Sequence, residues 1–498
     1  MALKPQLARL LFALLAALAL NASAVTRYVD LNSPSPTPPY ANWLTAATNI
    51  QDAVDTANNG DLILVTNGLY NVGSRTVVDS TPCRVVINKP VTVRSVNGPG
   101  ATVIEGHSEP GNFPWSLNSV RCAYMTNGAT LTGFTLSKGS VRATAYVNLA
   151  DPAGGVYCTS VSAVLSNCVI IDCASYVGGG AQSGTFSHCL ITNCVAHIGG
   201  GGIVSGNLDH CQVVWNTSDY YAGGLYLCQA TNCNINDNLG LFGGGAFGGS
   251  IFQCTVFGNY APTIPNFGGG IGGGLNNVDA RNSIIYYNLA EAGGDDIVTG
   301  TYTNCCSPSV PPGAGNITNA PLFIDTSSYP ANFHLQSNSP CINAGNSAPT
   351  SGPTDLDGRP RIAGPKVDIG SYEFQGATTN NFLTWLWIYH IPTDISSDFS
   401  DPDGDSLNNW QEWRADTVPT NAASALLMGT ATNGVAGLVV SWASVATRSY
   451  WLERATNLSV VSPFQLQATN VPGVAGTKTF NDTSATNGGP YFYRVGVQ

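Results

Sequence analysis

The chain has 498 residues, of which 56 are glycine and only 10% are charged, and its formal net charge is -11 at pH 7. No Lys or Arg lies between Arg142 and Arg281, so the basic side chains that bind nucleic acid or anionic lipid are missing there, and neither partner is expected. Few charges together with many Asn, Thr, Ser and Val residues favour strands and turns over helices, which predicts an all-β fold.

The first 24 residues have the pattern of a secretory signal peptide. Lys4 and Arg9 flank the start of the apolar run LLFALLAALAL (residues 10–20), and the small residues Ala-Ser-Ala at 22–24 form a cleavage site. The apolar run is about half the length of a bilayer-spanning helix, and no later stretch is long and apolar enough to span. We therefore expect an exported mature chain that begins at Val25 and has no transmembrane segment.

Residues 167–288 contain an internal repeat with a period near 22 residues. Its first cysteine column consists of Cys168, Cys189, Cys211, Cys233 and Cys254, with Ser283 next. Two positions later the residue is always Ile or Val, at 170, 191, 213, 235, 256 and 285, whereas the position between varies freely. This alternation is typical of a strand with one buried face. Short strands at this period, without helices between them, predict coils stacked about 4.8 Å apart in a parallel β-helix.

The segment HCLITNCVAHIGGGG (188–202) resembles a set of metal ligands when it is taken alone. Five residues after the first cysteine, however, the column reads Cys173, Cys194, Asn216, Asn238, Asn259 and Asn288. A zinc site would not tolerate asparagine, whereas a buried turn can hold either a thiol or an amide that bonds its neighbours. We expect buried thiols in the columns and His188 and His210 pointing outward. Seven cysteines, whose pairing stays open, are placed outside the columns: Cys83, Cys122, Cys158, Cys228, Cys305, Cys306 and Cys341.

Both ends of residues 25–374 carry motifs of a known superfamily. NIQDAVDTANNGDLILVTNGLYN (49–71) resembles the opening of exported right-handed β-helix proteins of the pectate-lyase-like superfamily, in which a short amphipathic helix caps the first coil. Residues 321–346 and 355–374 are similar to the choice-of-anchor cap of bacterial surface proteins. The resemblance implies a right-handed parallel β-helix, secreted or on the extracellular face of the bacterial envelope, with a C-terminal cap. We interpret the charged residues of the cap motif as fastening it to the last coil: Asp355, Asp357, Arg359, Arg361 and Asp368. The resemblance does not imply an activity, since the superfamily holds lyases, hydrolases, adhesins and inert stalks.

Residues 375–427 are expected to form a linker with one acidic loop, which resembles the calcium loops of dockerins and thrombospondin type 3 repeats. The side chains of Asp401, Asp403, Asp405, Asn409 and Glu412 and the carbonyl of Leu407 occupy positions one, three, five, nine, twelve and seven of an EF-hand-like loop. The pattern predicts a structural calcium ion. Ser406 stands where glycine is expected for the sharp turn, and a solvated acidic linker is the alternative.

Residues 428–498 alternate apolar and polar residues and end in a strong strand. They are similar to the fibronectin type III-like sandwiches of exported bacterial proteins, which implies a small β-sandwich. Trp442, Tyr450 and Trp451 are interpreted as core or sheet-face aromatic residues.

Two hypotheses for function remain open. The first is a non-enzymatic β-helix scaffold that displays outward columns, including Tyr176, His197, Trp215 and Tyr287, to an extracellular polysaccharide or another cell-surface component. The second is a polysaccharide lyase or glycoside hydrolase acting on acidic polysaccharide. Such an enzyme needs converging carboxylates or a base with cations, and residues 75–142 hold the only mixed-charge region of the predicted coils. Its candidate catalytic residues, beside Trp115, are Glu105, His107, Glu109 and Arg121.

Overall fold

The computed structural model describes residues 24–498 except 78–79, 109–115, 143–152, 266–267, 329, 349–351, 364, 376–381, 383–384, 387–388, 390, 392–396, 398, 435–436, 459–462, 487–488 and 498. All but the last residue of the predicted signal peptide, as well as Glu109 and Trp115, therefore lie outside the described residues. The chain forms two compact units, residues 1–324 with 333–374 and residues 325–332 with 375–498, and each is described by itself. Among the residues described, no helix combines the length and apolar character needed to cross a membrane.

The first unit begins with a strand and a short helix that precede the coils. Strand β1 (Thr26–Val29) pairs in parallel with β2 (Leu62–Val65), and the buried ion pair between Arg27 and Asp61 (2.9 Å) joins the starts of the two strands. The 3-10 helix η1 (Trp43–Thr45) and helix α2 (Ile50–Thr56) lie between them. Helix α2 begins after Asn49, whose side chain accepts the amide hydrogen of Asp52, and buries its apolar face through Ile50, Ala53 and Val54.

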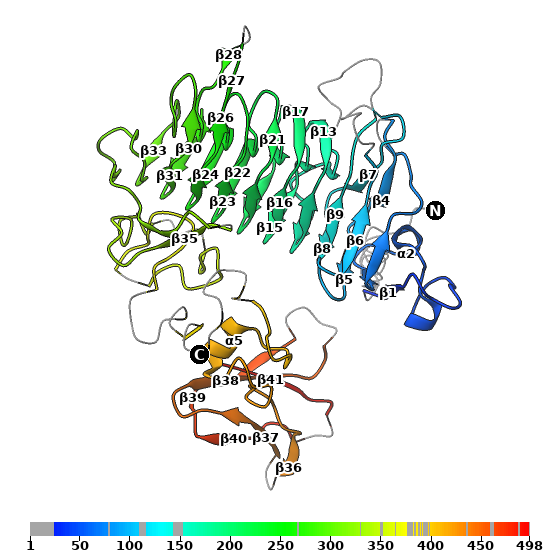
Figure 1. The fold of residues 1–498 in the computed structure, drawn as a ribbon. Helices are drawn as coiled ribbons and strands as arrows, with labels where there is room; N and C mark the ends of the chain where they lie inside the picture. The colour runs from blue at the N-terminus through cyan, green and yellow to red at the C-terminus, as the bar shows by residue number, and fades with distance from the viewer. Residues whose placement is uncertain are drawn as a thin grey trace, which may run out of the picture. The chain divides into compact units, whose positions relative to one another are not determined.

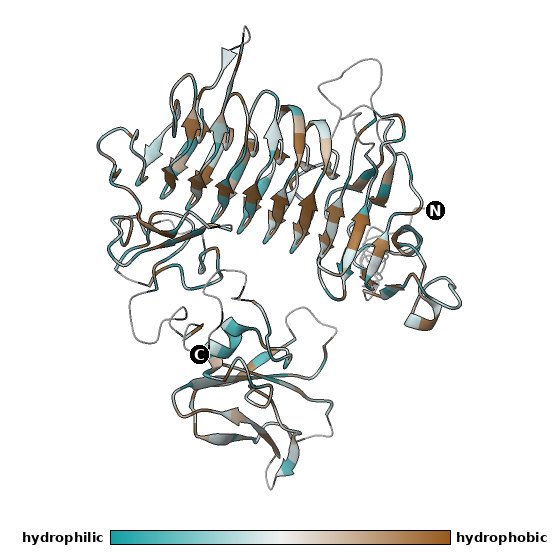
Figure 2. Ribbon diagram, viewed as in Figure 1, coloured by the Kyte–Doolittle hydropathy of each residue, from teal (hydrophilic) through white to brown (hydrophobic). Residues whose placement is uncertain are grey.

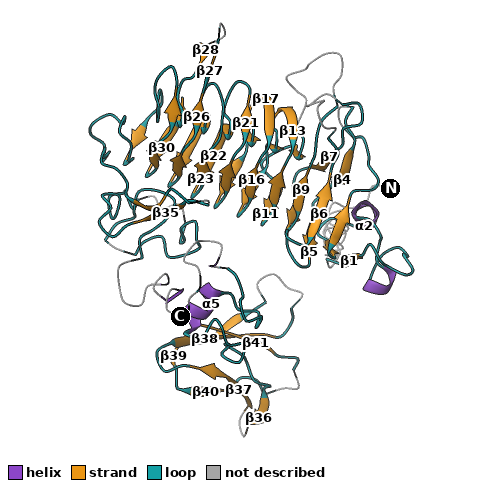
Figure 3. Ribbon diagram, in the orientation of Figure 1, coloured by secondary structure: helices purple, strands orange, loops and turns teal. Residues whose placement is uncertain are grey.

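Successive coils pair through parallel strands in two long sheets (Figure 1, Figure 3). The 9-stranded sheet holds β3 (Gly68–Tyr70), β6 (Thr102–Glu105), β9 (Thr135–Ser137), β12 (Val169–Ile171), β16 (Leu190–Thr192), β20 (Gln212–Val214), β23 (Asn234–Asn236), β25 (Thr255–Phe257) and β31 (Ile284–Tyr286). The 17-stranded sheet adds to β1 and β2 the strands β4 (Cys83–Ile87), β5 (Thr92–Ser95), β7 (Arg121–Met125), β8 (Thr130–Thr132), β10 (Val156–Cys158), β11 (Val164–Ser166), β14 (Ala181–Gln182), β15 (Thr185–Ser187), β18 (Ile203–Val204), β19 (Asn207–Asp209), β22 (Leu225–Thr231), β24 (Ala246–Phe252), β29 (Leu275–Asn276), β30 (Asp279–Arg281) and β33 (Tyr302–Thr303). The predicted all-β fold with a parallel β-helix is confirmed.

Shorter strands complete the coils. A third side contains β13 (Ala174–Val177), β17 (Val195–Gly199) and β21 (Thr217–Ser218), followed by the pair β26 (Tyr260–Ala261) and β32 (Leu289–Ala290). The insertion in the repeat forms an antiparallel hairpin of β27 (Thr263–Ile264) and β28 (Gly268–Gly269). The remaining strands before the second unit are β34 (Phe323–Asp325) and β35 (Asn332–Leu335).

The side chains of the Ile/Val column predicted from the repeat lie on the inner face of the 9-stranded sheet. Ile170, Ile191 and Val213 pair in register and are fully buried, as are the later members of the column. Figure 2 shows several strands of the coils in brown, the colour of hydrophobic residues. Because the side chains of a strand alternate between its faces, a shift of one residue would expose this whole column, so the pattern also fixes the register.

The first cysteine column is a ladder of buried thiols. The backbone N–H groups of Cys189, Cys211 and Cys233 donate to the sulfur of the cysteine one coil later, at 3.4–3.5 Å, and the N–H of Cys254 donates to Ser283 Oγ. All fourteen cysteines are free and buried, which confirms the predicted thiols. Cys305, which we placed outside the columns, is the next member of this column after Ser283. Arg281 pairs with Thr303, so Ser283 and Cys305, each two positions later in the chain, occupy equivalent positions.

The second column is an asparagine ladder. The backbone N–H and the side-chain amide of Asn216 both donate to Asn238 Oδ1 (3.0 Å each), and the same pair of bonds links Asn238 to Asn259 and Asn259 to Asn288. At the end, Asn288 donates both groups to Asp296 Oδ1. The predicted amide bonds between coils are therefore present, and the carbonyl oxygens of Asn238, Asn259 and Asn288 each have two donors.

The residue before each ladder cysteine has a left-handed backbone. Asn167, His188, His210 and Asn232 have φ angles between 48° and 53°. Asn and His are enriched in this conformation, which accounts for their frequency in the column, and Gln253 before Cys254 has the same backbone (φ 52°). The rings of His188 and His210 stack with their centres 4.9 Å apart. His188 is exposed, whereas His210 is buried and its Nε2 forms a hydrogen bond with Thr354 Oγ1. Both lie outside the coil, as predicted, and within the described ranges no metal-binding group of three or more His, Cys, Asp or Glu residues includes them.

The cap segment lies along the outer face of the 9-stranded sheet. Ser371 Oγ donates to Asn234 Oδ1 (2.6 Å) and also bonds Thr255, and Tyr372 Oη accepts from Asn234 Nδ2 (2.9 Å). We expected the charged residues of the cap to fasten it to the last coil, and this prediction is wrong. Polar side chains on the outer faces of several coils bond the cap, whereas Asp357 of the cap bonds His334 and Arg359, which also belong to the cap.

The second unit contains helix α5 (Asn409–Ala415) and two antiparallel sheets of three strands each. One sheet consists of β36 (Thr432–Gly434), β37 (Gly437–Ser444) and β40 (Gly476–Asp482), and the other of β39 (Gln465–Pro472), β38 (Ser449–Ala455) and β41 (Phe492–Val497). Val440 and Trp442 from one sheet meet Tyr450 and Leu452 from the other in one core. The predicted β-sandwich is confirmed, with Trp442 and Tyr450 in its core.

The asparagine ladder yields a prediction for stability. In Asn238→Ala, the two buried donors of Asn216 lose their acceptor, so we expect the free energy of unfolding, measured with urea, to fall by about 3 kcal/mol. Asn238→Cys should lose less, because cysteine occupies this column at 173 and 194 and its sulfur accepts an N–H. The control Asn97→Ala removes an exposed amide that bonds Asn67 and should change stability by less than about 0.5 kcal/mol. Equal losses for Asn238→Ala and Asn97→Ala would contradict the role of the ladder.

The buried carboxyl groups of the cap yield a prediction for pH dependence. Burial raises the pKa of Glu373 to about 7 and that of Asp368 to about 6. Because the folded-state pKa lies above the unfolded value, the folded cap binds protons more tightly, so its stabilising contribution is full below about pH 4 and falls as pH rises to about 7. Urea unfolding at pH 4.5, 6 and 8 should show this loss. Glu373→Gln should have a shallower pH dependence, and an unchanged slope would exclude Glu373 as a source.

Candidate functional sites

The mixed-charge region has Glu105 near its centre. This residue ends β6, and its carboxylate accepts hydrogen bonds from Lys138 Nζ (2.8 Å) and Asn71 Nδ2 (3.4 Å). The bond from Lys138 lowers the pKa of Glu105. A carboxyl group held ionised in this way suits a base or an anchor for a cation better than a general acid.

Of the other candidate catalytic residues, His107 and Arg121 are described, and only His107 is exposed. Arg121 begins β7 in the opposite long sheet and is fully buried, where its Nε donates to the carbonyl of Ala153 (2.6 Å) and its guanidinium lies 5.7 Å from the ring centre of Tyr157. His107 pairs through its backbone with Val120 and is exposed. A buried guanidinium cannot reach a polymer on the surface, so Arg121 contributes to packing between coils. The catalytic assignment of Glu105, His107 and Glu109 stays a prediction.

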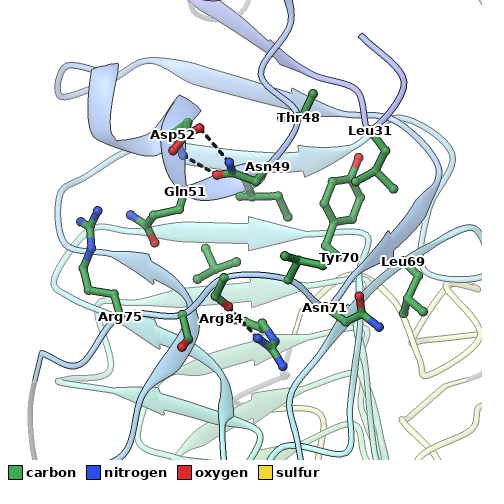
Figure 4. A pocket seen from close by; sticks show the side chains of 15 residues that line it. Leu31, Thr48, Asn49, Gln51, Asp52, Leu69, Tyr70, Asn71, Arg75 and Arg84 are labelled. Atoms are coloured by element: carbon green, nitrogen blue, oxygen red, sulfur yellow. Dashed lines mark hydrogen bonds between the residues drawn. The ribbon is translucent and has the colours of Figure 1, made fainter. Parts of the chain in front are cut away.

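A cavity of about 470 Å³ opens beside this region, between helix α2 and the chain that follows β3 (Figure 4). Its polar lining is bonded within the protein. Gln51 exchanges two hydrogen bonds with the backbone of Val86, and Arg75 forms an ion pair with Asp55. Arg84 donates to the carbonyls of Gly73 and Glu105. Sequence reasoning missed the cavity, because no periodic pattern relates helix α2 to the chain after β3.

Aromatic side chains gather on the outer surface of the coils. Trp215 and Tyr287, two of the residues predicted to be displayed, are 45% and 54% exposed. The rings of Tyr176 and His197, the other two, lie 5.1 Å apart, and His197 Nδ1 lies 2.8 Å from a carboxylate oxygen of Asp219.

A larger group, here named the aromatic cluster, was not predicted. It consists of Tyr220, Tyr221, Tyr226, Phe242 and Phe247, all of them partly exposed. Each ring lies within 6 Å of at least one other, centre to centre. The signal was present in two repeats, YYAGGLY and LFGGGAF, where aromatic residues flank the glycines at one-coil spacing.

The acidic loop of the second unit brings three of its predicted side chains together. One oxygen from each of Asp401, Asp403 and Asp405 lies within 4.8 Å of the others. Each aspartate also accepts a backbone N–H within the loop, Asp401 from Ser406 (2.9 Å), Asp403 from Asp405 (3.3 Å) and Asp405 from Leu407 (2.7 Å). Ser406, which replaces the expected glycine, has φ 79° and therefore keeps the sharp turn in a conformation that is costly for a residue with a Cβ.

Several oxygens in this loop fit a bound cation. Asn409 and Glu412 lie in helix α5 and are fully buried. Asp403 Oδ2, Asp405 Oδ2, Asn409 Oδ1 and Glu412 Oε2 are buried and have no hydrogen-bond partner. Burial and the charges of Asp403 and Asp405 raise the pKa of Glu412 to about 7. Unpaired carboxylate and amide oxygens at this spacing form the ligand set that a hard divalent cation prefers.

The coils and the two-sheet module define a parallel β-helix protein with a small β-sandwich. No family model and no curated protein matches the chain. Among solved structures, pectate lyase Pel9A is similar at 17% identity, covering 71% of this chain and 97% of its own, with a TM-score of 0.46. A rhamnogalacturonan lyase shares 13% identity over 57% of this chain and 87% of its own, with a TM-score of 0.32. The pectin methylesterase PemA from Erwinia chrysanthemi shares 15% over 60% and 94%, with a TM-score of 0.30. This likeness is one of fold.

Proposed function

We propose that the protein is a secreted or cell-surface scaffold that binds extracellular polysaccharide on the outer surface of its coils. The observation that carries the proposal is the exposure of aromatic rings, including Trp215 and Tyr287, which directly follow the in-register strands β20 and β31. Tyr and Trp provide large, rigid contact areas with little loss of side-chain entropy, which suits the flat faces of sugar rings. The bonding of Arg121 and Lys138 to protein groups also favours binding over uronate chemistry, which needs cations directed at the substrate.

The second candidate function is a lyase or glycoside hydrolase acting on acidic polysaccharide. The cavity beside Glu105 favours it, because Arg84 and Arg75 supply positive charge to its wall. In this alternative, Glu105 or His107 would act on a sugar whose carboxylate is neutralised there.

One panel of polysaccharides tests both functions. We expect the mature protein, residues 25–498, to be retained by at least one insoluble glycan or polysaccharide gel, and Trp215→Ala or Tyr287→Ala to weaken retention where the ring contacts it. The same mixtures are followed for new unsaturated uronate by ultraviolet absorbance and for new reducing ends. If wild type forms product and the Glu105→Gln and His107→Ala variants do not, the protein is an enzyme and the scaffold function is wrong. A protein that neither binds nor cleaves any polymer would contradict both functions.

We also propose that the acidic loop binds one structural calcium ion. Asp401, Asp403, Asp405, Asn409 and Glu412 would hold it with their side chains, and Leu407 with its backbone carbonyl, as the loop spacing predicts. The buried, unpartnered oxygen of Glu412 supports the assignment, because three nearby aspartates otherwise repel its charge. A cation would offset that repulsion and connect the loop to helix α5.

Calcium titration and chelation test the loop. Isothermal titration should give one site per chain, and EGTA should lower the unfolding temperature of the full chain, because an ion that binds only the folded state stabilises it. Glu412→Gln should weaken binding at least about tenfold, and Ser406→Gly should tighten it by relieving the left-handed serine. The control Glu453→Gln, which removes a carboxylate paired with Arg494 in the same unit, should bind normally. The assignment fails if wild type shows no calcium uptake, or if Glu412→Gln and Glu453→Gln behave alike.

A further inference from the structure

The position of the aromatic cluster follows from the stacking of two neighbouring coils. Tyr226 of β22 pairs in register with Phe247 of β24, and an isolated parallel bridge pairs Tyr221 with Phe242. These four rings form two rows, Tyr221 with Phe242 and Tyr226 with Phe247, and each row spans the same two successive coils. Tyr220 adds a fifth ring next to Tyr221. Because strand neighbours are spaced at about 4.8 Å, the rings are held at fixed separations by the backbone.

The rings of the cluster contact one another closely. Tyr221 and Tyr226 stack with centres 5.5 Å apart and planes 9° apart, and Phe247 lies 4.9 Å from Tyr221. Gly199 lies next to this stack, since a Cβ added there would approach Tyr226 Cδ1 to 3.1 Å and Tyr221 Cβ to 3.3 Å. The glycine lets the tyrosine rings lie close to the backbone of the preceding coil. The result is a fixed apolar surface whose phenol oxygens can bond hydroxyl groups.

The charge around the cluster limits what it can bind. The cluster lies within the stretch from Arg142 to Arg281, in which there is no Lys or Arg. The acidic residue next to it in the chain is Asp219, whose side chain is 58% exposed and faces His197. A polyuronate or a sulfated chain would therefore lie beside a carboxylate with no Lys or Arg from these coils to offset its charge, which is unfavourable at short range. An uncharged glycan avoids this repulsion, and Asp219 can accept its hydroxyl hydrogens.

We propose that the aromatic cluster is the polysaccharide-binding site and that its ligand is an uncharged glycan chain. This inference rests on the proposed scaffold function and adds both the location and the ligand class. It also sets the chain apart from an acidic-polysaccharide enzyme, whose substrate would bind at the cation-bearing cavity near Glu105.

Affinity electrophoresis of the mature protein tests the inference with defined soluble polymers. The uncharged probes are hydroxyethylcellulose, glucomannan and laminarin, and the anionic probes are polygalacturonate and alginate. We expect retardation by at least one uncharged polymer, with Tyr221→Ala and Tyr226→Ala each weakening it about tenfold, the effect of losing one well-packed aromatic contact. Tyr226→Phe should keep most of the affinity, because the ring remains. Trp43→Ala serves as a matched control, because Trp43 is an exposed aromatic residue that precedes the coils, and it should bind like wild type.

The outcomes separate the inference from the function on which it rests. Binding to anionic polymers alone would overturn the inference and leave the scaffold function standing, whereas binding to no polymer would overturn both. Uncharged binding that survives both tyrosine variants but is lost in Trp215→Ala would move the site elsewhere. A dimer in sedimentation velocity that dissociates in Tyr221→Ala would make the cluster a contact between copies, and would also overturn the inference. Should the variants unfold, hydroxyl-radical footprinting of wild type with glucomannan decides, since protection at residues 220–247 is expected and its absence refutes the site.

Discussion

The hydrogen bonding of each coil to the next, in register and in parallel, is the constraint on which the rest of the first unit depends. A parallel ladder satisfies the backbone N–H and C=O groups of every strand, but at the corners between strands the chain turns and these groups lose their strand partners. The ladders of cysteine and asparagine supply acceptors at these corners. Asn238 and Asn259 each use one carbonyl oxygen to accept two donors of the preceding coil, so the corner is bonded as completely as the strand. The register of the sheet and the identity of the corner residue therefore reinforce each other.

This constraint explains why much of the coil could be predicted from sequence. The buried column of Ile170 and its equivalents, the thiol ladder and the amide ladder all recur at one period, so a physical role assigned once applies to every coil. The same logic accounts for the His188 and His210 pair. The column requires a left-handed residue, and His can take the place of Asn there for that reason alone. The acidic loop was also predictable, because its ligand spacing is local and its five side chains lie within twelve residues.

Features that depend on contacts between distant segments could not be predicted in this way. The cap was expected at the last coil, yet Ser371 and Tyr372 bond Asn234 and Thr255, more than a hundred residues earlier in the chain. Nothing in the local pattern of either segment specifies that pairing. Arg121 resembled a substrate-binding cation because its charge is visible in the sequence, whereas its burial against Ala153 and Tyr157 depends on the neighbouring coils. The aromatic cluster is intermediate, since its repeat is visible but only the register of β22 and β24 shows that the rings meet.

The distribution of charge follows from the same architecture and bears on function. The apolar coil interior disfavours unpaired charges, so the ionised side chains of the coils lie on outward faces or, like Arg121, are buried with hydrogen-bond partners. Where the cap buries charges, it matches Asp357 with His334 and Arg359. Where the coils face solvent between Arg142 and Arg281, they carry aromatic, amide and hydroxyl groups and a few aspartates. A surface of this kind can recognise a long ligand only through ring contacts and hydroxyl hydrogen bonds repeated from coil to coil. That chemistry matches an uncharged polymer with a regular repeat, for which the rigidity of the stack limits the entropy lost on binding.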